Sequence, residues 1–361
     1  MGKRELLLIA GFVLLGAIVY QVTAPPSDGA GLSPTRTIER LRRLVAGNAA
    51  SVVVERSETL DVPAEIDTLR VENVAEVRVT GEARANLSAA LRVRSTGLDP
   101  EDARRLARLT AIERRRADGR LVLGVTYPAE GRQRAILDLR VPARLALVLV
   151  RTTRAEIEGV GTAQLDDTRG ELLLRAVREA VQGRHSGGRL RLSGAGRVDL
   201  AVGRATVEVE DLSAGGRIES RGGTLRLRAI RGRTVVQGRG TAVEIAGASG
   251  PLELDLIGGR CDVRDLTGAA RITARDMAMV RVHLARVAPL TITSEGDIDL
   301  ALPPRSGVEL DAHTEEGSIS LPPDAAVPVV ARGRGQHAAG LLNGGGALVR
   351  LRSTEGTIVV R

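Results

Sequence analysis

Two consecutive segments decide the fold of this chain: GRIESRGGTLRLRAIRGR at residues 216–233 and TVVQGRGTAVEIAGASGP at residues 234–251. Each is 18 residues long, and apolar residues occupy the same positions in both. The same period holds without a gap from residue 196 to residue 285. Such self-similarity is typical of a solenoid, in which each coil buries its apolar side chains against those of its neighbours.

Written in rows of 18, the repeat aligns into four apolar columns. These comprise Leu200, Ile218, Val236, Leu254 and Ile272; Val207, Leu225, Val243, Cys261 and Met279; Val209, Leu227, Ile245 and Val263; and Leu212, Ile230, Ala248, Leu266 and Leu284. The second and third columns are two residues apart, so their side chains share one face of a strand. We expect Leu290 to extend the first column beyond the regular repeat.

The spacing of the columns predicts two strands and two turns in each coil. A three-sided helix would need a further apolar column directly before the second one, where Thr206, Thr224, Ala242 and Arg260 stand instead. We therefore predict an all-β fold, a parallel β-solenoid with about 18 residues per coil. It is preceded by an N-terminal transmembrane helix, described below.

Composition narrows the classes of partner. Aromatic residues make up 1% of the chain, and beyond residue 22 the sole aromatic is Tyr127. This argues against binding of sugars or single-stranded nucleic acid through stacking. The net charge is +8, but Glu208, Arg226, Glu244 and Asp262 would lie side by side with mixed signs. We favour a solvated, charge-laced surface; the alternative is a polyanion-binding face.

The N-terminus indicates a membrane anchor. Lys3 and Arg4 precede an apolar run from Leu6 to Val22, which is long enough to span a bilayer. We predict an uncleaved signal anchor over residues 1–24, through which the membrane is a partner. The alternative is a signal peptide cleaved after Ala24, although Pro25 directly follows that bond.

Residues 25–50 are predicted to form a linker with a short amphipathic helix from Thr35 to Ala46. This helix lies on the membrane surface in one interpretation and is a stalk beneath the solenoid in the other. Residues 51–361 are expected to form the strand-repeat domain.

Irregular elements flank the repeat. Before it we predict strands at residues 51–56, 68–80, 135–141 and 145–152, and a hairpin of residues 109–115 and 120–126 around Asp118-Gly119. A short helix is expected to begin at Pro100, with Asp99 as its N-cap. After the repeat, TSEGDI (293–298), TEEGSI (314–319) and STEGTI (353–358) each place a glycine turn before a strand. The glycine-rich stretch from Arg332 to Gly346 is predicted to be a loop.

At these residues the chain resembles a bacterial candidate-adhesin family of β-strand repeats, which has no characterised function and is related to autotransporter adhesin heads. The matching features are LRVENV at 69–74, the helix and hairpin of 99–126, LDLRVP at 137–142, the glycine-turn ladder and the closing GTIVV at 356–360. The resemblance covers roughly residues 50–361. It implies an envelope-exposed β-solenoid without known catalytic residues. In this chain, Glu or Arg often replaces the serine that precedes glycine in the family's turns.

We searched the sequence for chemistry and predict no catalytic, cofactor-binding or metal-binding residues. His185, His283, His313 and His337 have no ligand-like spacing and are interpreted as surface residues. Cys261 is expected to be a small buried hydrophobe. The pairs Asp166-Asp167 and Glu315-Glu316 would point to opposite faces of a strand, so neither is expected to act as a catalytic pair. The glycine pairs lack the lysine and helix that a P-loop needs.

We therefore expect a non-enzymatic protein of the cell envelope. It would be a single-pass protein of the cytoplasmic membrane, with the bulk of the chain in the periplasm or on the cell surface. There it would act as a structural, adhesive or interaction module for an envelope polymer or protein. The alternatives are an envelope-stress sensor or regulatory partner and, less favoured, a polysaccharide-degrading β-helix enzyme. The sequence argues against nucleic acid as the partner and leaves the oligomeric state open.

Overall fold

The computed structural model describes residues 50–117, 119–130 and 132–361. The predicted anchor of residues 1–24 and the helix of residues 35–46 fall outside these residues. Within the described part of the chain, no helix is long and apolar enough to cross a membrane.

The chain forms two compact units. The smaller contains Arg94–Leu109, Pro128–Gln133 and, among the described residues, 50–54, while the larger contains Glu55–Val93, Thr110–Tyr127 and Arg134–Arg361. Strands β1 (Ala50–Leu60), β4 (Leu87–Gly97) and β7 (Arg132–Pro142) contribute residues to both units.

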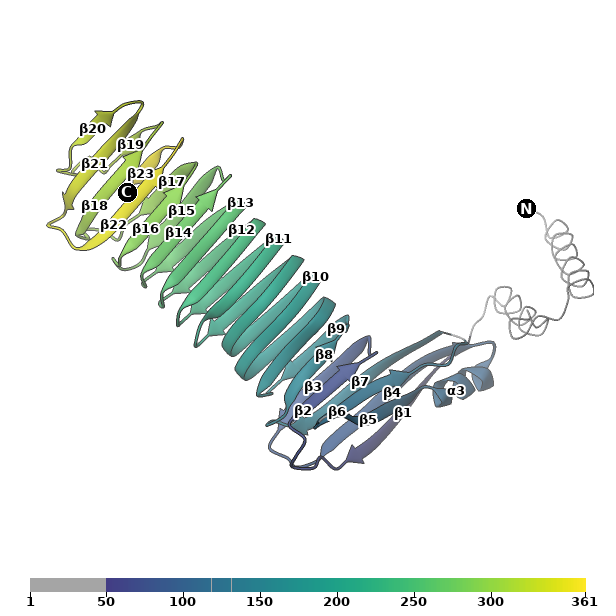
Figure 1. Cartoon of the computed structure of the whole chain (residues 1–361). Helices are drawn as coiled ribbons and strands as arrows, with labels where there is room; N and C mark the ends of the chain where they lie inside the picture. Colours follow the sequence, from purple (N-terminus) through teal and green to yellow (C-terminus); the bar gives the residue numbers. More distant parts are fainter. Residues whose placement is uncertain (1–49, 118, 131) are drawn as a thin grey trace, which may run out of the picture. The chain divides into compact units, whose positions relative to one another are not determined.

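The larger unit is built on a stack of parallel strands, drawn side by side in Figure 1. Its centre consists of β10 (Thr162–Leu212), β11 (Gly216–Ile230), β12 (Thr234–Ala248) and β13 (Leu252–Leu266). Leu200 pairs with Ile218, Ile218 with Val236, and Val236 with Leu254. The register thus confirms the period of the sequence. The column residues other than Met279 are buried, so the core is a row of stacked, mostly aliphatic side chains inside the coils.

Each coil turns at two corners where the backbone enters the left-handed region. Arg204, Gly222, Gly240 and Gly258 have φ of 47°, 73°, 59° and 66°, and Asp211, Ala229, Gly247 and Asp265 have φ of 57°, 51°, 72° and 54°. Each set is one residue position repeated in successive coils. Glycine, asparagine and aspartate tolerate this conformation best, which explains the glycine-rich rhythm of the sequence. The two corners separate two straight strand segments, as the column spacing predicted.

Two column assignments were wrong at the end of the repeat. Cys261 pairs with Val280 and not with Met279, whose side chain is exposed. The turn before β15 (Met279–Leu284) holds an extra residue, and Met277 is buried there. Likewise Ile272 pairs with Ile292, so Leu290 continues the column of Ala270. An insertion in a turn shifts which residue faces inward, because inward and outward positions alternate along a strand.

The coils near the C-terminus are not stacked in chain order. Four successive coils along the chain each consist of two strands. They are β14 (Ala270–Arg275) with β15, β16 (Leu290–Ser294) with β17 (Asp297–Ala301), β18 (Val308–Thr314) with β19 (Ile319–Ser320), and β22 (Ala347–Ser353) with β23 (Ile358–Val360). In space, β22 pairs with both β16 and β18, and β23 pairs with both β17 and β19. The last coil of the chain is therefore inserted between the two coils that precede it.

The three glycine turns stack on one another in this region. Gly296, Gly317 and Gly356 precede β17, β19 and β23, as predicted. Ser353 Oγ donates to the Gly296 carbonyl at 2.9 Å, and Thr314 Oγ1 donates to the Gly356 carbonyl at 3.0 Å. In these two motifs the hydroxyl residue thus fastens its coil to the glycine of the neighbouring coil.

The predicted loop from Arg332 to Gly346 is wrong, because it contains a strand. β21 (Gly335–Leu342) pairs antiparallel with β18, and β20 (Val329–Arg332) pairs antiparallel with β21. Ala338 and Leu342 are buried in it. The glycines gave a loop signal, but β18 offers an unpaired edge whose backbone groups need partners.

The N-terminal part of the larger unit repeats this insertion. β2 (Thr68–Glu72) pairs with β6 (Arg120–Thr126) and β8 (Ala146–Val150), and β3 (Glu76–Glu82) pairs with β7 and β9 (Arg154–Glu158). The single strand predicted at residues 68–80 is broken at Asn73, whose φ is 57°. The predicted hairpin is confirmed as β5 (Ala111–Ala117) and β6.

The predicted helix is also confirmed, in the smaller unit. α3 (Pro100–Leu109) begins after Asp99, whose Oδ1 accepts from the amides of Glu101 and Asp102 at 2.9 and 2.8 Å. This is the expected N-cap.

Candidate functional site

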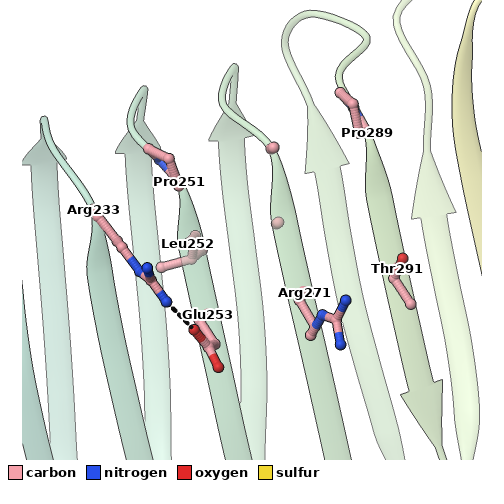
Figure 2. A pocket seen from close by; sticks show the side chains of 9 residues that line it. Arg233, Pro251, Leu252, Glu253, Arg271, Pro289 and Thr291 are labelled. Carbon is pink, nitrogen blue, oxygen red and sulfur yellow. Dashed lines mark hydrogen bonds and ion pairs between the residues drawn. The ribbon is translucent and has the colours of Figure 1, made fainter.

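A surface groove lies at one corner of the coils, where strands β12, β13, β14 and β16 begin (Figure 2). It has a volume of about 560 Å³. We call it the corner groove; it is lined by Arg233, Pro251, Leu252, Glu253, Ala269, Ala270, Arg271, Pro289 and Thr291.

Backbone pairing explains why prolines border this groove. The amides of Thr234, Leu252 and Ala270 donate to the carbonyls of Pro251, Ala269 and Pro289, at 2.8, 2.9 and 3.0 Å. The residue before each strand therefore contributes only its carbonyl group to the hydrogen bonds between neighbouring coils. Proline, which has no N–H, fits at that position. Ala269 stands between the two prolines in the stack, and its small side chain leaves the hollow.

Two arginines and one carboxylate supply the charge of the corner groove. Arg233 Nη2 lies 3.0 Å from Glu253 Oε2. Arg271 extends away from Glu253 towards the strand of Thr291 (Figure 2). The only carboxylate of the lining is thus held by a guanidinium, and no nucleophile stands beside a base. The groove has the means to hold a polar or anionic segment but lacks an acid–base pair.

The second strand segment of each coil carries a row of charges of mixed sign, which we call the charge ladder: Arg191, Glu208, Arg226, Glu244 and Asp262. Arg191 Nε lies 2.9 Å from Glu208 Oε2, and Arg226 lies 3.7 Å from Glu208 and 3.0 Å from Glu244. Asp262 is buried and pairs instead with Arg264 at 2.8 Å, whose hydrogen bond lowers the pKa of the carboxyl group. The mixed-sign row expected from the sequence is confirmed here.

The histidines do not all lie on the surface. His185 is buried inside the coils with 1% of its area exposed, and its Nδ1 lies 3.2 Å from Thr168 Oγ1. Burial lowers its pKa. The prediction was wrong for this residue, because its position on the coil faces the interior beside the buried Thr168 of the preceding coil. His313 and His337, distant in sequence, are opposite one another on β18 and β21, with ring centroids 6.0 Å apart.

An ion cluster that sequence reasoning missed surrounds Asp311 on β18. Arg352 Nη2 donates to Asp311 Oδ2 at 2.6 Å, Arg350 Nε at 3.2 Å, and His337 Nε2 lies 3.5 Å from Oδ1. The hydrogen bond from Arg352, with those from Arg350 and His337, lowers the pKa of Asp311 to about 2. No sequence signal could locate this cluster, since it depends on β22 pairing beside β18.

The remaining residues singled out in the sequence lie as follows. Cys261 is buried, and burial together with the charge of Asp262 raises the pKa of its thiol to about 12. Asp166 lies 3.9 Å from Arg70, and Glu316 lies 2.7 Å from Arg334, so each pair has a member bound to arginine. Across the described ranges, no group of three or more histidine, cysteine or acidic residues could hold a metal ion.

No family model matches the chain, and no curated protein matches it. Three crystal structures are similar: a candidate cell adhesion protein from Clostridium sporogenes (8% identity, TM-score 0.21, 86% of this chain and 99% of that one) and candidate adhesins from Parabacteroides distasonis (10%, 0.32, 85% and 97%) and Parabacteroides merdae (10%, 0.31, 86% and 96%). They belong to the class that the sequence resemblance names.

Proposed function

We propose that this protein is a rigid contact module of the cell envelope, structural or adhesive, which works through its surface without covalent chemistry. In this proposal the chain is a β-solenoid that residues 6–22 anchor in the cytoplasmic membrane, with residues 51–361 outside the cytoplasm. Support for the anchor comes from the apolar run and the basic residues Lys3 and Arg4 that precede it.

The charge ladder is the observation that carries the contact role. Its charges are fixed one coil apart by the backbone register, with Glu208 beside Arg226 and Arg226 beside Glu244. A stacked parallel sheet moves little, so a partner meets charges whose positions are set before binding. Preorganisation of this kind lowers the entropy cost of association. The corner groove, with a paired carboxylate and no acid–base pair, favours binding over catalysis.

The test is protease digestion of the full chain expressed in intact spheroplasts, followed by sequencing of the N-terminus of the membrane-bound product. We expect digestion from outside that leaves Met1 in the membrane. Protection of the repeats would contradict the proposed location. A second arm deletes residues 1–24, and we expect the remainder to be released as a soluble, folded β protein. Aggregation of this variant would contradict an anchored, independently folding module.

A further inference from the structure

At a second corner of the coils, two adjacent arginines have no side-chain partner among the residues that the structure describes. Arg221 on β11 and Arg239 on β12 are direct neighbours in the parallel register, which places their Cα atoms about 4.8 Å apart. Both side chains are exposed. Neither makes a hydrogen bond or ion pair through its guanidinium to any residue in the described part of the chain.

The acids near these arginines are already engaged. Glu219 lies 2.9 Å from Arg217, on the same strand. Asp255 lies 2.9 Å from Arg275. The two carboxylates that could neutralise Arg221 and Arg239 are therefore paired with Arg217 and Arg275. The charges of Arg221 and Arg239 remain unneutralised at this corner.

The centre of the charge ladder is arranged differently. There Arg226 stands between Glu208 and Glu244, so these neighbouring strands carry opposite charges. The next residue of the ladder, Asp262, has the same charge as Glu244 but is paired with Arg264. Like charges directly opposite one another on paired strands are destabilising. An anion that lies between two guanidinium groups held side by side would offset this repulsion.

The surface is hollow at this point. A polar groove of about 200 Å³ lies here, and three arginines and two arginine-paired carboxylates contribute to it. It is lined by Arg221, Arg239, Arg275, Glu219, Asp255, Ser220, Gln237, Gly238 and Ile257. We call it the arginine groove. Ser220 is buried, and its Oγ accepts from Thr241 Oγ1 at 3.2 Å, so the floor is held in place by the coil itself.

We propose that the arginine groove binds a sulfate or phosphate ester carried on an anionic polysaccharide. Each guanidinium presents a planar fork that binds two oxygen atoms. A carboxylate has two oxygens, which one arginine satisfies, whereas a tetrahedral ester group has enough terminal oxygens to bridge both forks. Beyond residue 22 the chain has only Tyr127 as an aromatic residue, so neither a sugar ring nor a base would be held by stacking, and the contact is made to the ester group itself. A polysaccharide is the carrier that fits the location proposed above, outside the cytoplasm. The inference rests on the proposed contact role and names the chemistry of its partner.

The test measures binding of the full chain to dextran sulfate, to polygalacturonate as a carboxylate polymer, and to neutral dextran. We expect dextran sulfate to bind best, and the double variant Arg221→Gln/Arg239→Gln to weaken this binding about tenfold. The slope of log affinity against log salt should fall by up to about 2, one for each lost ionic contact. Thermal unfolding of the variant should be unchanged or raised, because like-charge repulsion is removed.

The matched control is Arg197→Gln/Arg228→Gln, which removes the same charge from exposed arginines of β10 and β11 that lie outside the groove. It should change binding less than twofold. Equal weakening by both double variants would overturn the site, as would tighter binding of polygalacturonate than of dextran sulfate. Tighter binding of oligothymidylate would overturn the polysaccharide in favour of nucleic acid. These outcomes are separate from the spheroplast test, since a chain protected from protease that still binds dextran sulfate through Arg221 and Arg239 would refute only the location.

Discussion

Ile292 pairs in parallel with Leu351, near the end of the chain, and not with Ala312, which lies in the next coil along the sequence. Leu351 in turn pairs with Ala312 on its other side. The C-terminal segment therefore completes the stack from within, between β16 and β18. The antiparallel strands β21 and β20 follow β18, so the parallel stack ends in a hairpin and not in a bare coil edge.

Disulfide trapping tests this coil order. Thr293 and Arg352 are register partners on β16 and β22, so their Cα atoms lie about 4.8 Å apart, within the range of a disulfide. We expect the variant Thr293→Cys/Arg352→Cys to cross-link on mild oxidation. The variant Thr293→Cys/His313→Cys spans two strand spacings, about 9.6 Å, and should stay reduced. The reverse pattern, detected by mass spectrometry, would mean that the coils stack in chain order.

Replacing the glycine of the last motif should destabilise this end of the stack. A Cβ at Gly356 would overlap the carbonyl carbon of Gly296 in the coil below. We expect Gly356→Ala to lower the free energy of unfolding by about 1–3 kcal/mol, the range for overpacking. The control Gly203→Ala adds the same methyl group where the nearest atom, Ser186 Cβ, is 3.9 Å away. Similar denaturant midpoints for the two variants would contradict the glycine stack.

His185 should make the stability of the protein depend on pH. Burial lowers its pKa below the ordinary value of 6.5, so the unfolded chain binds more protons than the folded chain just below pH 6.5. The free energy of unfolding is therefore highest above pH 6.5, where His185 is neutral in both states. It falls as the pH drops from 6.5 towards the pKa of the folded state, with a slope of at most about 1.4 kcal/mol per pH unit.

The measurement is urea unfolding between about pH 8 and pH 5 for the parent chain and for His185→Gln. We expect the variant to lose this part of the slope, whatever its stability at pH 8. His283→Gln serves as the control, since His283 is 48% exposed. If His283→Gln flattened the profile as much as His185→Gln, the buried imidazole would not be the cause.

Reversing a charge of the charge ladder should lower the free energy of unfolding more than removing that charge. Arg226 is 40% exposed, so losing its ion pairs in Arg226→Gln should cost less than about 1 kcal/mol. Arg226→Glu places a carboxylate between those of Glu208 and Glu244, and we expect a larger loss that shrinks in about 1 M salt. Arg204→Glu, at an exposed corner, is the control. A loss for Arg226→Glu that ignored salt would point to packing and not to charge.

Much of the repeat was open to prediction because its information is local. The columns of Leu200 and Val209 could be read from an exact period, and each inward position follows from alternation along a strand. Asp99 and Pro100 likewise mark their helix through chemistry within one turn of it. The resulting mixed-sign row around Arg226 followed directly from the register.

The errors arose where distant segments decide the outcome. Gly335–Leu342 has the composition of a loop but forms a strand because β18 is beside it. One inserted residue in a turn places Val280, and not Met279, in the buried column. The Asp311 cluster needs Arg350 and Arg352, which reach it only after β22 has inserted.

By itself the sequence determined the coil: its length, its two strand segments, its buried columns and the charges on its outer faces. These follow from short-range steric rules, which act on residues within one repeat. Only the tertiary structure decided the order in which the terminal coils stack, the burial of His185 and the lack of partners for Arg221 and Arg239 within residues 50–117, 119–130 and 132–361. Backbone hydrogen bonds between parallel strands are alike for any sequence, so the choice of neighbour depends on how whole coils fit together.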